Sequence, residues 1–183
     1  MTIRPEGMVI WITGLPASGK STLAERLLGS LEAQGVVTMW LDSDDLRRVI
    51  TPKATYALAE RDNFYKALGH VAALSAKGGA IVVVSATAPR REHRETVRRL
   101  VPSFHEVYLY CAEYIRRARD KKGLYEQQDA GLITTLPGAG MAYEEPPHPE
   151  LRFDSGVMSP ETLMDEMLAY LRGLGSGLTE DLV

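Results

Sequence analysis

Near its start the chain carries a lysine between glycines and hydroxyl residues, in the segment "GLPASGKST". The spacing fits G-x-x-x-x-G-K-[S/T], a loop whose glycines let backbone N–H groups turn toward phosphate oxygens. Lys20 is expected to reach the β- and γ-phosphates of a nucleotide, and the hydroxyl of Ser21 to ligate Mg²⁺. The residues predicted to bind the nucleotide are Gly14, Leu15, Pro16, Ala17, Ser18, Gly19, Lys20, Ser21 and Thr22.

Acidic residues follow the second apolar run, in "LDSDDLR". On a strand beside the phosphate loop, Asp42 or Asp44 could accept a proton from an attacking hydroxyl while the other holds a metal-bound water. A continuing strand would place both on one face, since side chains alternate with a period of two. Alternatively, Ser43 or Asp44 caps a following helix, and Asp45 is a charge at its start. With Lys20, Asp42 and Asp44 form the predicted catalytic set.

Apolar runs and helical patterns alternate along the chain. The predicted strands are 8–13, 36–41, 80–84 and 106–110, with 151–153 as a possible edge strand. The predicted helices are 20–35, 60–79, 90–100 and 159–175. Continuous apolar strands separated by helices are typical of a parallel sheet that is covered on both faces. The pattern therefore predicts an α/β fold, a P-loop NTPase three-layer sandwich.

Composition narrows the class of protein. A chain of 183 residues suits one domain, 1–183, and a net charge of −3 requires no nucleic-acid or membrane partner. No run approaches the ~20 apolar residues of a membrane span, and the first residues lack the apolar core of a signal peptide. The single cysteine, Cys111, excludes an internal disulfide, fits the cytoplasm and is expected to be buried. Residues 121–150 are rich in Gly and Pro and are expected to form a lid, the alternative being a passive surface loop.

Several motifs together resemble the adenylylsulfate (APS) kinase family. Beside "GLPASGKST" and "LDSDDLR" stand "SATAPRREHR", "RDKKGLY" and "AYEEPPHPELRFDS", so the resemblance covers almost the whole chain. The last two motifs are the most specific, because a phosphate loop alone is shared by many families. Many GTP switches carry an N-K-x-D sequence, whereas this chain has no Asn-Lys pair.

The resemblance implies a Mg²⁺-dependent homodimeric enzyme that transfers the γ-phosphate of ATP to the 3′-hydroxyl of APS, giving PAPS and ADP in sulfate assimilation. Asp44 matches the acidic residue near that hydroxyl, and Arg47 matches an arginine that contacts APS. Arg119 lies where the family has a residue along the ATP adenine. Lys122 belongs to the lid that would close over the acceptor, and Arg91 matches a further family arginine.

Four positions depart from the family pattern. Leu136 stands where the lid has an aromatic platform, and in the helix pattern "DRxxNxRR" Arg61 keeps the first arginine while Phe64 replaces Asn and Lys66 is the nearest later cation. Phe64 either supplies the missing aromatic surface or belongs to the core. Ala88 replaces a serine that some members phosphorylate, so transfer here should be direct. Arg61, Phe64 and Leu136 complete the predicted acceptor site.

These departures leave two further functions open. One is a kinase of the same architecture that acts on another hydroxyl, such as a nucleotide, sugar or antibiotic. The other is a regulatory nucleotide-binding subunit, against which the retained carboxylates argue. Arg98 and Arg99 are expected to form part of a solvated helix face. The four histidines show no metal-ligand spacing, so none is assigned to chemistry.

Overall fold

The computed structural model describes residues 7–174, and they contain one five-stranded parallel sheet in the order β2-β3-β1-β4-β5. The strands are β1 (Met8–Thr13), β2 (Thr38–Asp42), β3 (Ile81–Ser85), β4 (Phe104–Tyr110) and β5 (Leu151–Asp154). Every residue of β1 and β3 is buried, as expected for inner strands covered on both faces. The predicted strands are confirmed to within two residues at each end, with β5 at one edge.

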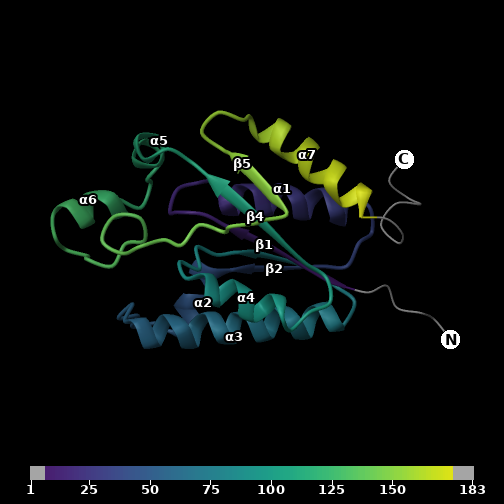
Figure 1. Cartoon of the computed structure of the whole chain (residues 1–183), viewed down its shortest axis with the longest axis horizontal. Coiled ribbons are helices and arrows are strands. Elements are labelled where there is room, and N and C mark those ends of the chain that lie inside the picture. Colours follow the sequence, from purple (N-terminus) through teal and green to yellow (C-terminus); the bar gives the residue numbers. More distant parts are fainter. Residues whose placement is uncertain (1–6, 175–183) are drawn as a thin grey trace.

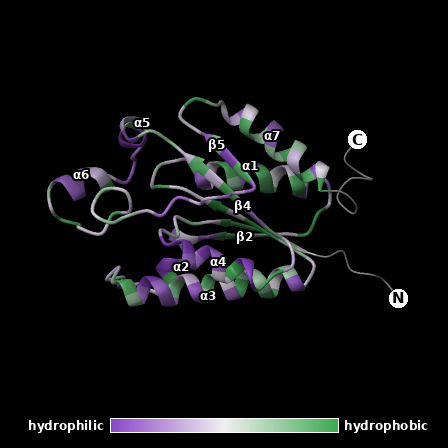
Figure 2. Cartoon of the chain, viewed as in Figure 1, coloured by the Kyte–Doolittle hydropathy of each residue, from purple (hydrophilic) through white to green (hydrophobic). Residues whose placement is uncertain are grey.

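Helices cover both faces of this sheet, so the predicted three-layer α/β architecture is confirmed (Figure 1). They are α1 (Lys20–Glu32), α2 (Ser43–Ile50), α3 (Leu58–Lys77), α4 (Arg91–Arg98), α5 (Glu113–Ala118), α6 (Leu124–Asp129) and α7 (Pro160–Gly173). One apolar core lies between the sheet and α3 with α4, and a second lies between the sheet and α1 with α7. Figure 2 shows the green apolar strands between helices of mixed colour.

Local sequence explains how the helices begin and which face they bury. Helix α1 buries Leu23, Leu27 and Leu31, whose spacing gives one apolar stripe. Helix α7 begins after Ser159, whose hydroxyl accepts from the N–H of Thr162, as the sequence predicted. The predicted last residue of this helix, 175, lies outside the described residues.

Strand order corrects one expectation about the acidic segment. Strand β3 pairs with both β1 and β2, so Asp42 ends a strand that is one place removed from the phosphate-loop strand. The chain also turns into α2 directly after Asp42, so Asp42 and Asp44 do not share a continuing strand. The sequence suggested a continuing strand because a strand that ends in a helix cap looks like a strand that continues. It suggested a neighbouring strand because the order of strands in a sheet is set by tertiary packing and cannot be read along the chain.

The predicted lid region is less irregular than expected, because it contains helix α6. This helix and the loop after it lie at the end of the molecule toward which the β4 arrow points (Figure 1). Carboxyl ends of parallel strands are where ligands bind in such folds. Within residues 7–174, no helix is both long and apolar enough to cross a membrane.

Candidate nucleotide and acceptor site

The phosphate loop between β1 and α1 has the backbone that its sequence predicts. Gly19 caps α1 with a φ of 95°, and Ala17 also has a positive φ, 61°, which turns successive N–H groups inward. At Gly14 any side chain is excluded, because a Cβ would lie 2.5 Å from the carbonyl oxygen of Leu109. The loop and the N-terminus of α1 therefore form an anion-binding concavity.

Lys20 lies inside this loop, where its Nζ donates to the carbonyl of Leu15 at 2.9 Å. Burial lowers the pKa of Lys20 to about 8, although the nearby carboxylates of Asp44 and Asp42 act in the opposite direction. Both acidic residues thus lie close enough to influence the ammonium group, as expected for one site. A phosphate group bound in the loop would favour the charged form of Lys20.

Asp42 is surrounded by hydrogen-bond donors. Its Oδ2 accepts from the hydroxyls of Ser21 at 2.8 Å and Ser85 at 2.7 Å, and its Oδ1 accepts from the N–H groups of Asp44 and Asp45. Burial acts to raise the pKa of Asp42, but these hydrogen bonds outweigh it and hold the pKa below its usual value. Asp42 is also the N-cap of α2, a role that the sequence had suggested for Ser43 or Asp44.

These contacts separate the roles of the two carboxylates. A carboxylate has about four acceptor positions, and in Asp42 donors occupy all of them, so its oxygens are poorly placed to take a proton from a substrate. Asp44 instead projects from the first turn of α2 and is half exposed, with its Oδ2 2.5 Å from Nζ of Lys122. Among the described residues Lys122 is the one side chain that pairs with the Asp44 carboxylate, so Asp44 is the better candidate of the two for a base.

Arg47 is a buried cation with few partners. Its guanidinium carbon lies 3.9 Å from the centre of the Phe64 ring, and among the described residues its two terminal nitrogens have no hydrogen-bond partner. The nearest carboxylate, on Glu60, is 3.6 Å from Nη1. Because buried charges are normally hydrogen-bonded, these nitrogens indicate a position for an anionic ligand.

Of the two roles expected for Phe64, the structure confirms the place in the core and contradicts the place in the acceptor site. Only 1% of Phe64 is exposed, it belongs to the core under α3, and the Arg47 guanidinium covers its ring. It therefore supports Arg47 and offers no free surface to a substrate ring. Leu136 is likewise buried, with 6% exposed, so its side chain offers little surface as a platform.

Tyr56 is a residue that the sequence reasoning missed. It is 43% exposed, has a positive φ of 57°, and its ring centre lies about 5 Å from the guanidinium carbons of both Arg47 and Arg61. A positive φ is unusual for a bulky residue, and such conformations cluster at ligand sites. The signal in the sequence was an aromatic residue nine positions after an arginine, which is too weak to recognise alone.

Contacts from the body of the protein hold the lid in place. Arg61 donates from Nη2 to the carbonyl of Thr135 at 2.7 Å and from Nε to the carbonyl of Tyr56 at 3.0 Å. Gly138 lies against Leu15 of the phosphate loop, so closely that a Cβ at this position would be 2.6 Å from that side chain. Arg61 and Gly138 thus hold the loop after α6 against the body of the protein, next to Leu15 of the phosphate loop.

Residues 143–150, which we call the return segment, are attached to α4 and β4. Arg91 donates its Nε–H to the carbonyl of Glu145 and its backbone N–H to the carboxylate of Glu144. Arg94, which is buried, donates to the carbonyl of Glu144 at 2.7 Å and to Glu106 at 2.6 Å. Arg91 therefore holds the return segment, and the mobile part of a lid would have to end before it.

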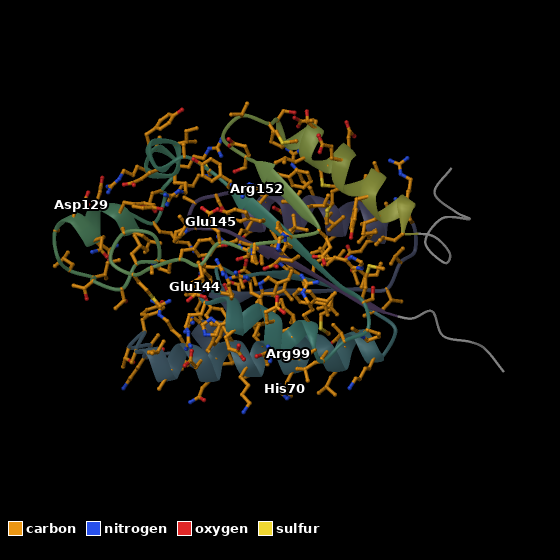
Figure 3. All side chains as sticks on the ribbon, viewed as in Figure 1. His70, Arg99, Asp129, Glu144, Glu145 and Arg152 are labelled. Carbon is orange, nitrogen blue, oxygen red and sulfur yellow. The ribbon has the colours of Figure 1, made fainter. Side chains whose placement is uncertain are left out.

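Arg98 was expected on a solvated face, and this is wrong. It is partly buried and binds the carboxylate of Glu150 through both terminal nitrogens, at 2.5 and 3.1 Å. A run of arginines in the sequence does not reveal that Glu150, 52 positions later, forms an ion pair with Arg98. Arg99 is exposed, as expected, and so is His70 on the outer face of α3 (Figure 3).

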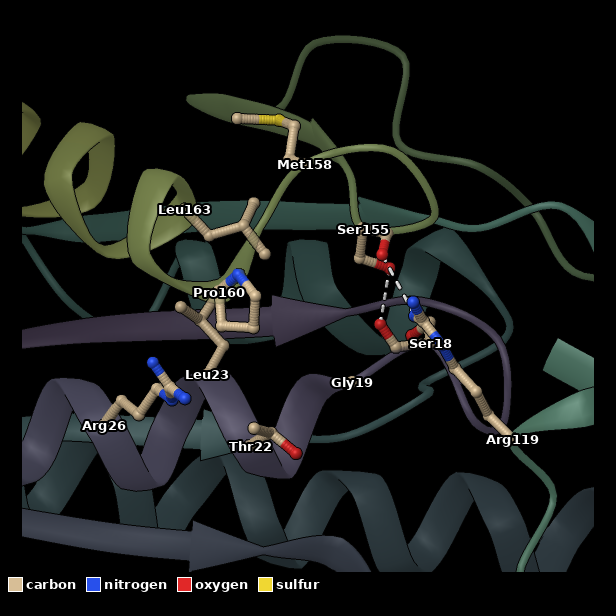
Figure 4. Close-up of a pocket in the computed structure, with 10 residues that line it drawn as sticks. All are labelled: Ser18, Gly19, Thr22, Leu23, Arg26, Arg119, Ser155, Met158, Pro160 and Leu163. Carbon is tan, nitrogen blue, oxygen red and sulfur yellow. Dashed lines mark hydrogen bonds between the residues drawn. The ribbon is translucent and has the colours of Figure 1, made fainter. Parts of the chain in front are cut away.

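A pocket of about 210 Å³ opens beside the phosphate loop (Figure 4). Arg119 borders it and donates to the carbonyl of Ser155 at 3.0 Å, while the Ser155 hydroxyl donates to the carbonyl of Ser18 at 2.7 Å. Its lining consists of Ser18, Gly19, Thr22, Leu23, Arg26, Arg119, Ser155, Met158, Pro160 and Leu163. The mixture of apolar side chains and arginines next to a phosphate loop fits a nucleotide base and sugar. Cys111, also near Arg119, is buried as predicted.

The residues around Ser21 fit Mg²⁺ held largely by phosphate oxygens and water. In residues 7–174 there is no cluster of three or more His, Cys, Asp or Glu side chains that could hold a metal ion. Mg²⁺ in phosphoryl-transfer sites needs only one or two protein oxygens. The Ser21 hydroxyl donates its proton to Asp42, which leaves the serine lone pairs free for a cation.

Comparison with known proteins agrees with this geometry. A family model described as "Adenylylsulphate kinase" matches residues 6–154. A probable adenylyl-sulfate kinase of Pyrococcus abyssi is 34% identical over 93% of this chain and 98% of its own length. A probable bifunctional SAT/APS kinase of Sorangium cellulosum is 36% identical, and this chain spans only 29% of that protein's length.

A solved structure extends the similarity to three dimensions. The Mycobacterium tuberculosis APS kinase CysC, in complex with AMPPNP and APS, superposes with a TM-score of 0.86 at 33% identity. The match covers 92% of this chain and 99% of the mycobacterial one. With the phosphate loop, the acidic segment and the return segment all in place, the chain belongs to the adenylylsulphate kinase family.

Proposed function

We propose that this protein transfers the γ-phosphoryl group of ATP to the 3′-hydroxyl of adenylyl sulfate, with Mg²⁺ as cofactor, and releases PAPS and ADP. The observation that carries the proposal is Arg47, a buried guanidinium whose terminal nitrogens have no hydrogen-bond partner within residues 7–174 and which lies beside the exposed Tyr56. A cation and an aromatic ring together suit an acceptor that carries both anionic groups and a base. Family membership supports the same substrate.

The chain's own residues supply most of the catalysis. Lys20 and the loop N–H groups would hold the β- and γ-phosphates, and Mg²⁺ near Ser21 would neutralise their charge. Asp44 would accept the proton of the 3′-hydroxyl while the hydroxyl oxygen of the acceptor bonds to the γ-phosphorus. The bond from that phosphorus to the β–γ bridging oxygen breaks, and ADP leaves. Ala88 provides no phosphoryl carrier, so transfer is direct.

Asp44 must be released from Lys122 for this role. Both side chains are more than half exposed, and an exposed ion pair contributes only about 0–1 kcal/mol. Binding of the acceptor can therefore displace Lys122 at little cost and bring its ammonium group onto an acceptor anion. The lid, held by Arg61, would exclude water, which otherwise competes as the phosphoryl acceptor.

The experiment is an ADP-release assay with APS against a panel of other nucleotides and sugars. We expect saturable turnover with APS, a product phosphorylated at the 3′-position by mass spectrometry and NMR, and no turnover with 3′-deoxy-APS. Turnover with a sugar or another nucleotide, and none with APS, would refute the proposal in favour of a related kinase.

The finer expectations on assembly and location go with this proposal. The resemblance implies a homodimer that works in the cytoplasm within sulfate assimilation. Light scattering after size-exclusion chromatography should give about twice the chain mass of 20.2 kDa. A monomer mass at micromolar concentration would contradict the dimer without affecting the assigned reaction.

A further inference from the structure

A chain of hydrogen bonds runs from the edge of the sheet to the phosphate loop. The indole Nε1 of Trp40 lies 3.0 Å from Oγ of Ser85, which lies 2.7 Å from Oδ2 of Asp42. The same carboxylate oxygen accepts from Ser21 at 2.8 Å. We call these residues, Trp40, Ser85, Asp42 and Ser21, the Trp40 relay.

The chemistry of the groups fixes the direction of every hydrogen bond in the relay. An indole N–H can only donate, so Ser85 accepts from Trp40 and its single hydroxyl proton goes to Asp42. Asp42, being ionised, accepts from Ser21 as well. Ser21 therefore presents its lone pairs, and not its proton, to the phosphate side of the site. Reversing the first bond would require the indole to accept, and reversing either bond to Asp42 would require that carboxylate to carry a proton.

Sheet topology explains why a relay is needed here. Asp42 lies opposite Ser85 in the register of β2 with β3, and β3 separates Asp42 from β1. Ser85 thus ends the strand that borders the phosphate-loop strand, and its hydroxyl bridges from this strand to the carboxylate beyond it. Trp40, two residues before Asp42 on the same face of β2, completes the bridge from the outer edge.

We propose that Trp40 and Ser85 are positioning residues that hold Asp42, and through it Ser21, in the orientation that Mg²⁺–nucleotide binding requires. The inference rests on the proposed use of ATP with Mg²⁺ but not on the identity of the acceptor. Groups that hydrogen-bond directly to a metal ligand, as Asp42 does to Ser21, commonly affect metal affinity about 10–100-fold, and Ser85 acts one hydrogen bond further out, through Asp42. Trp40 should also report on the site, because it is 39% exposed whereas Trp11, the other tryptophan, is fully buried.

The test measures AMPPNP binding by calorimetry, once with Mg²⁺ and once with EDTA. In Ser85→Ala we expect the gain in affinity that Mg²⁺ provides to fall about tenfold. In Trp40→Phe it should fall about fivefold, the effect of one neutral hydrogen bond. Affinity in EDTA should stay within about twofold of the parent value in both variants, because the phosphate loop itself is untouched. Ser85→Thr, which retains the hydroxyl, should restore the gain.

Met39→Leu is the matched control. Met39 is on the same strand and equally exposed, but its sulfur faces Ser75 of α3 and takes no part in the relay. The fluorescence change on adding Mg²⁺ with AMPPNP should persist in Met39→Leu, and the Mg²⁺-dependent gain in affinity should keep its parent value there. Because the side chain of Trp40 is at a sheet edge, we expect Trp40→Phe to fold, which circular dichroism checks.

The proposal is overturned if the Mg²⁺-dependent gain is unchanged in both variants. It is equally overturned if affinity falls by the same factor in EDTA, which would mean general distortion of the loop, or if Ser85→Thr behaves like Ser85→Ala. These results are independent of the acceptor panel. A protein that rejects APS yet shows the predicted magnesium effect would refute the proposed substrate and leave the Trp40 relay standing.

Discussion

Replacing Asp44 by Asn tests the assignment of the catalytic base most directly. The substitution removes the charge and the proton acceptor but keeps the size of the side chain. It should leave the affinity for Mg²⁺–ATP nearly unchanged, because Asp44 makes no hydrogen bond to the phosphate loop within the described residues. The rate of transfer to APS should fall, since nothing else at this position can take the proton.

The expected size of each effect follows from the contacts. Loss of a general base costs at least about 100-fold in kcat, or roughly 2.7 kcal/mol of barrier. Loss of the exposed pair with Lys122 costs only about 0–1 kcal/mol of stability. Asp42→Asn should behave differently, because an amide cannot accept at all four positions. It should lower the free energy of unfolding by about 1–3 kcal/mol and weaken Mg²⁺–ATP binding.

Single-turnover quenched-flow kinetics with labelled ATP would separate chemistry from product release. Asp45→Asn is the matched control, since Asp45 is the neighbouring residue and, among residues 7–174, its side chain pairs only with the exposed Arg48. Its transfer rate should match that of the unmodified protein. A rate for Asp44→Asn within tenfold of the unmodified protein would refute the base assignment. So would an equal loss in Asp45→Asn, which would point to general electrostatics.

Three further outcomes are expected. Lys20 binds phosphate in its charged form and its pKa is about 8, so ATP affinity should weaken above that pH, by up to about tenfold per pH unit. Calorimetry in two buffers at pH 8.5 should show proton uptake on ATP binding, and Lys20→Ala should abolish turnover. Arg47→Lys should raise the KM for APS at least about tenfold at unchanged ATP affinity, while the exposed Arg48→Lys changes neither; equal KM values in steady-state assays would exclude Arg47 from the acceptor site. Burial acts to raise the pKa of Glu150, but hydrogen bonds from Arg98 and from the N–H of Glu106 outweigh it and lower the pKa below 4.5. The stabilisation that ionised Glu150 gives the fold is therefore present above pH 4.5 and lost as the pH falls. Urea unfolding at pH 7 should therefore show Glu150→Gln about 1–3 kcal/mol less stable, a difference that shrinks in acid and is absent for the exposed Glu166→Gln.

Local sequence was sufficient where neighbouring residues cause the structure. The phosphate loop, for example, depends on glycines at fixed spacing, so the positive φ at Gly19 and the exclusion of any side chain at Gly14 follow from short-range sterics. Apolar runs such as Met8–Thr13 similarly predict buried strands, because their side chains must be covered on both faces. The family motifs identified the remaining site residues by their positions along the chain, without the contacts that they make.

Roles that depend on distant residues could not be obtained in this way. The local pattern treats Asp42 and Asp44 alike, and only the family resemblance singled out Asp44. The structure adds a physical difference, because the hydroxyls of Ser21 and Ser85, which come from other elements, bind Asp42 and not Asp44. Phe64 became a support for Arg47 because α2 packs on α3.

The amino-acid sequence by itself thus determined that this chain binds phosphate at the end of β1 in an α/β sheet, because loop conformation and strand burial are local properties. Only the tertiary structure decided strand order, the partners of Arg98 and the hydrogen-bond partners that distinguish the two aspartates. Those features depend on which side chains meet after residues tens of positions apart are packed together, and no spacing along the chain encodes that directly.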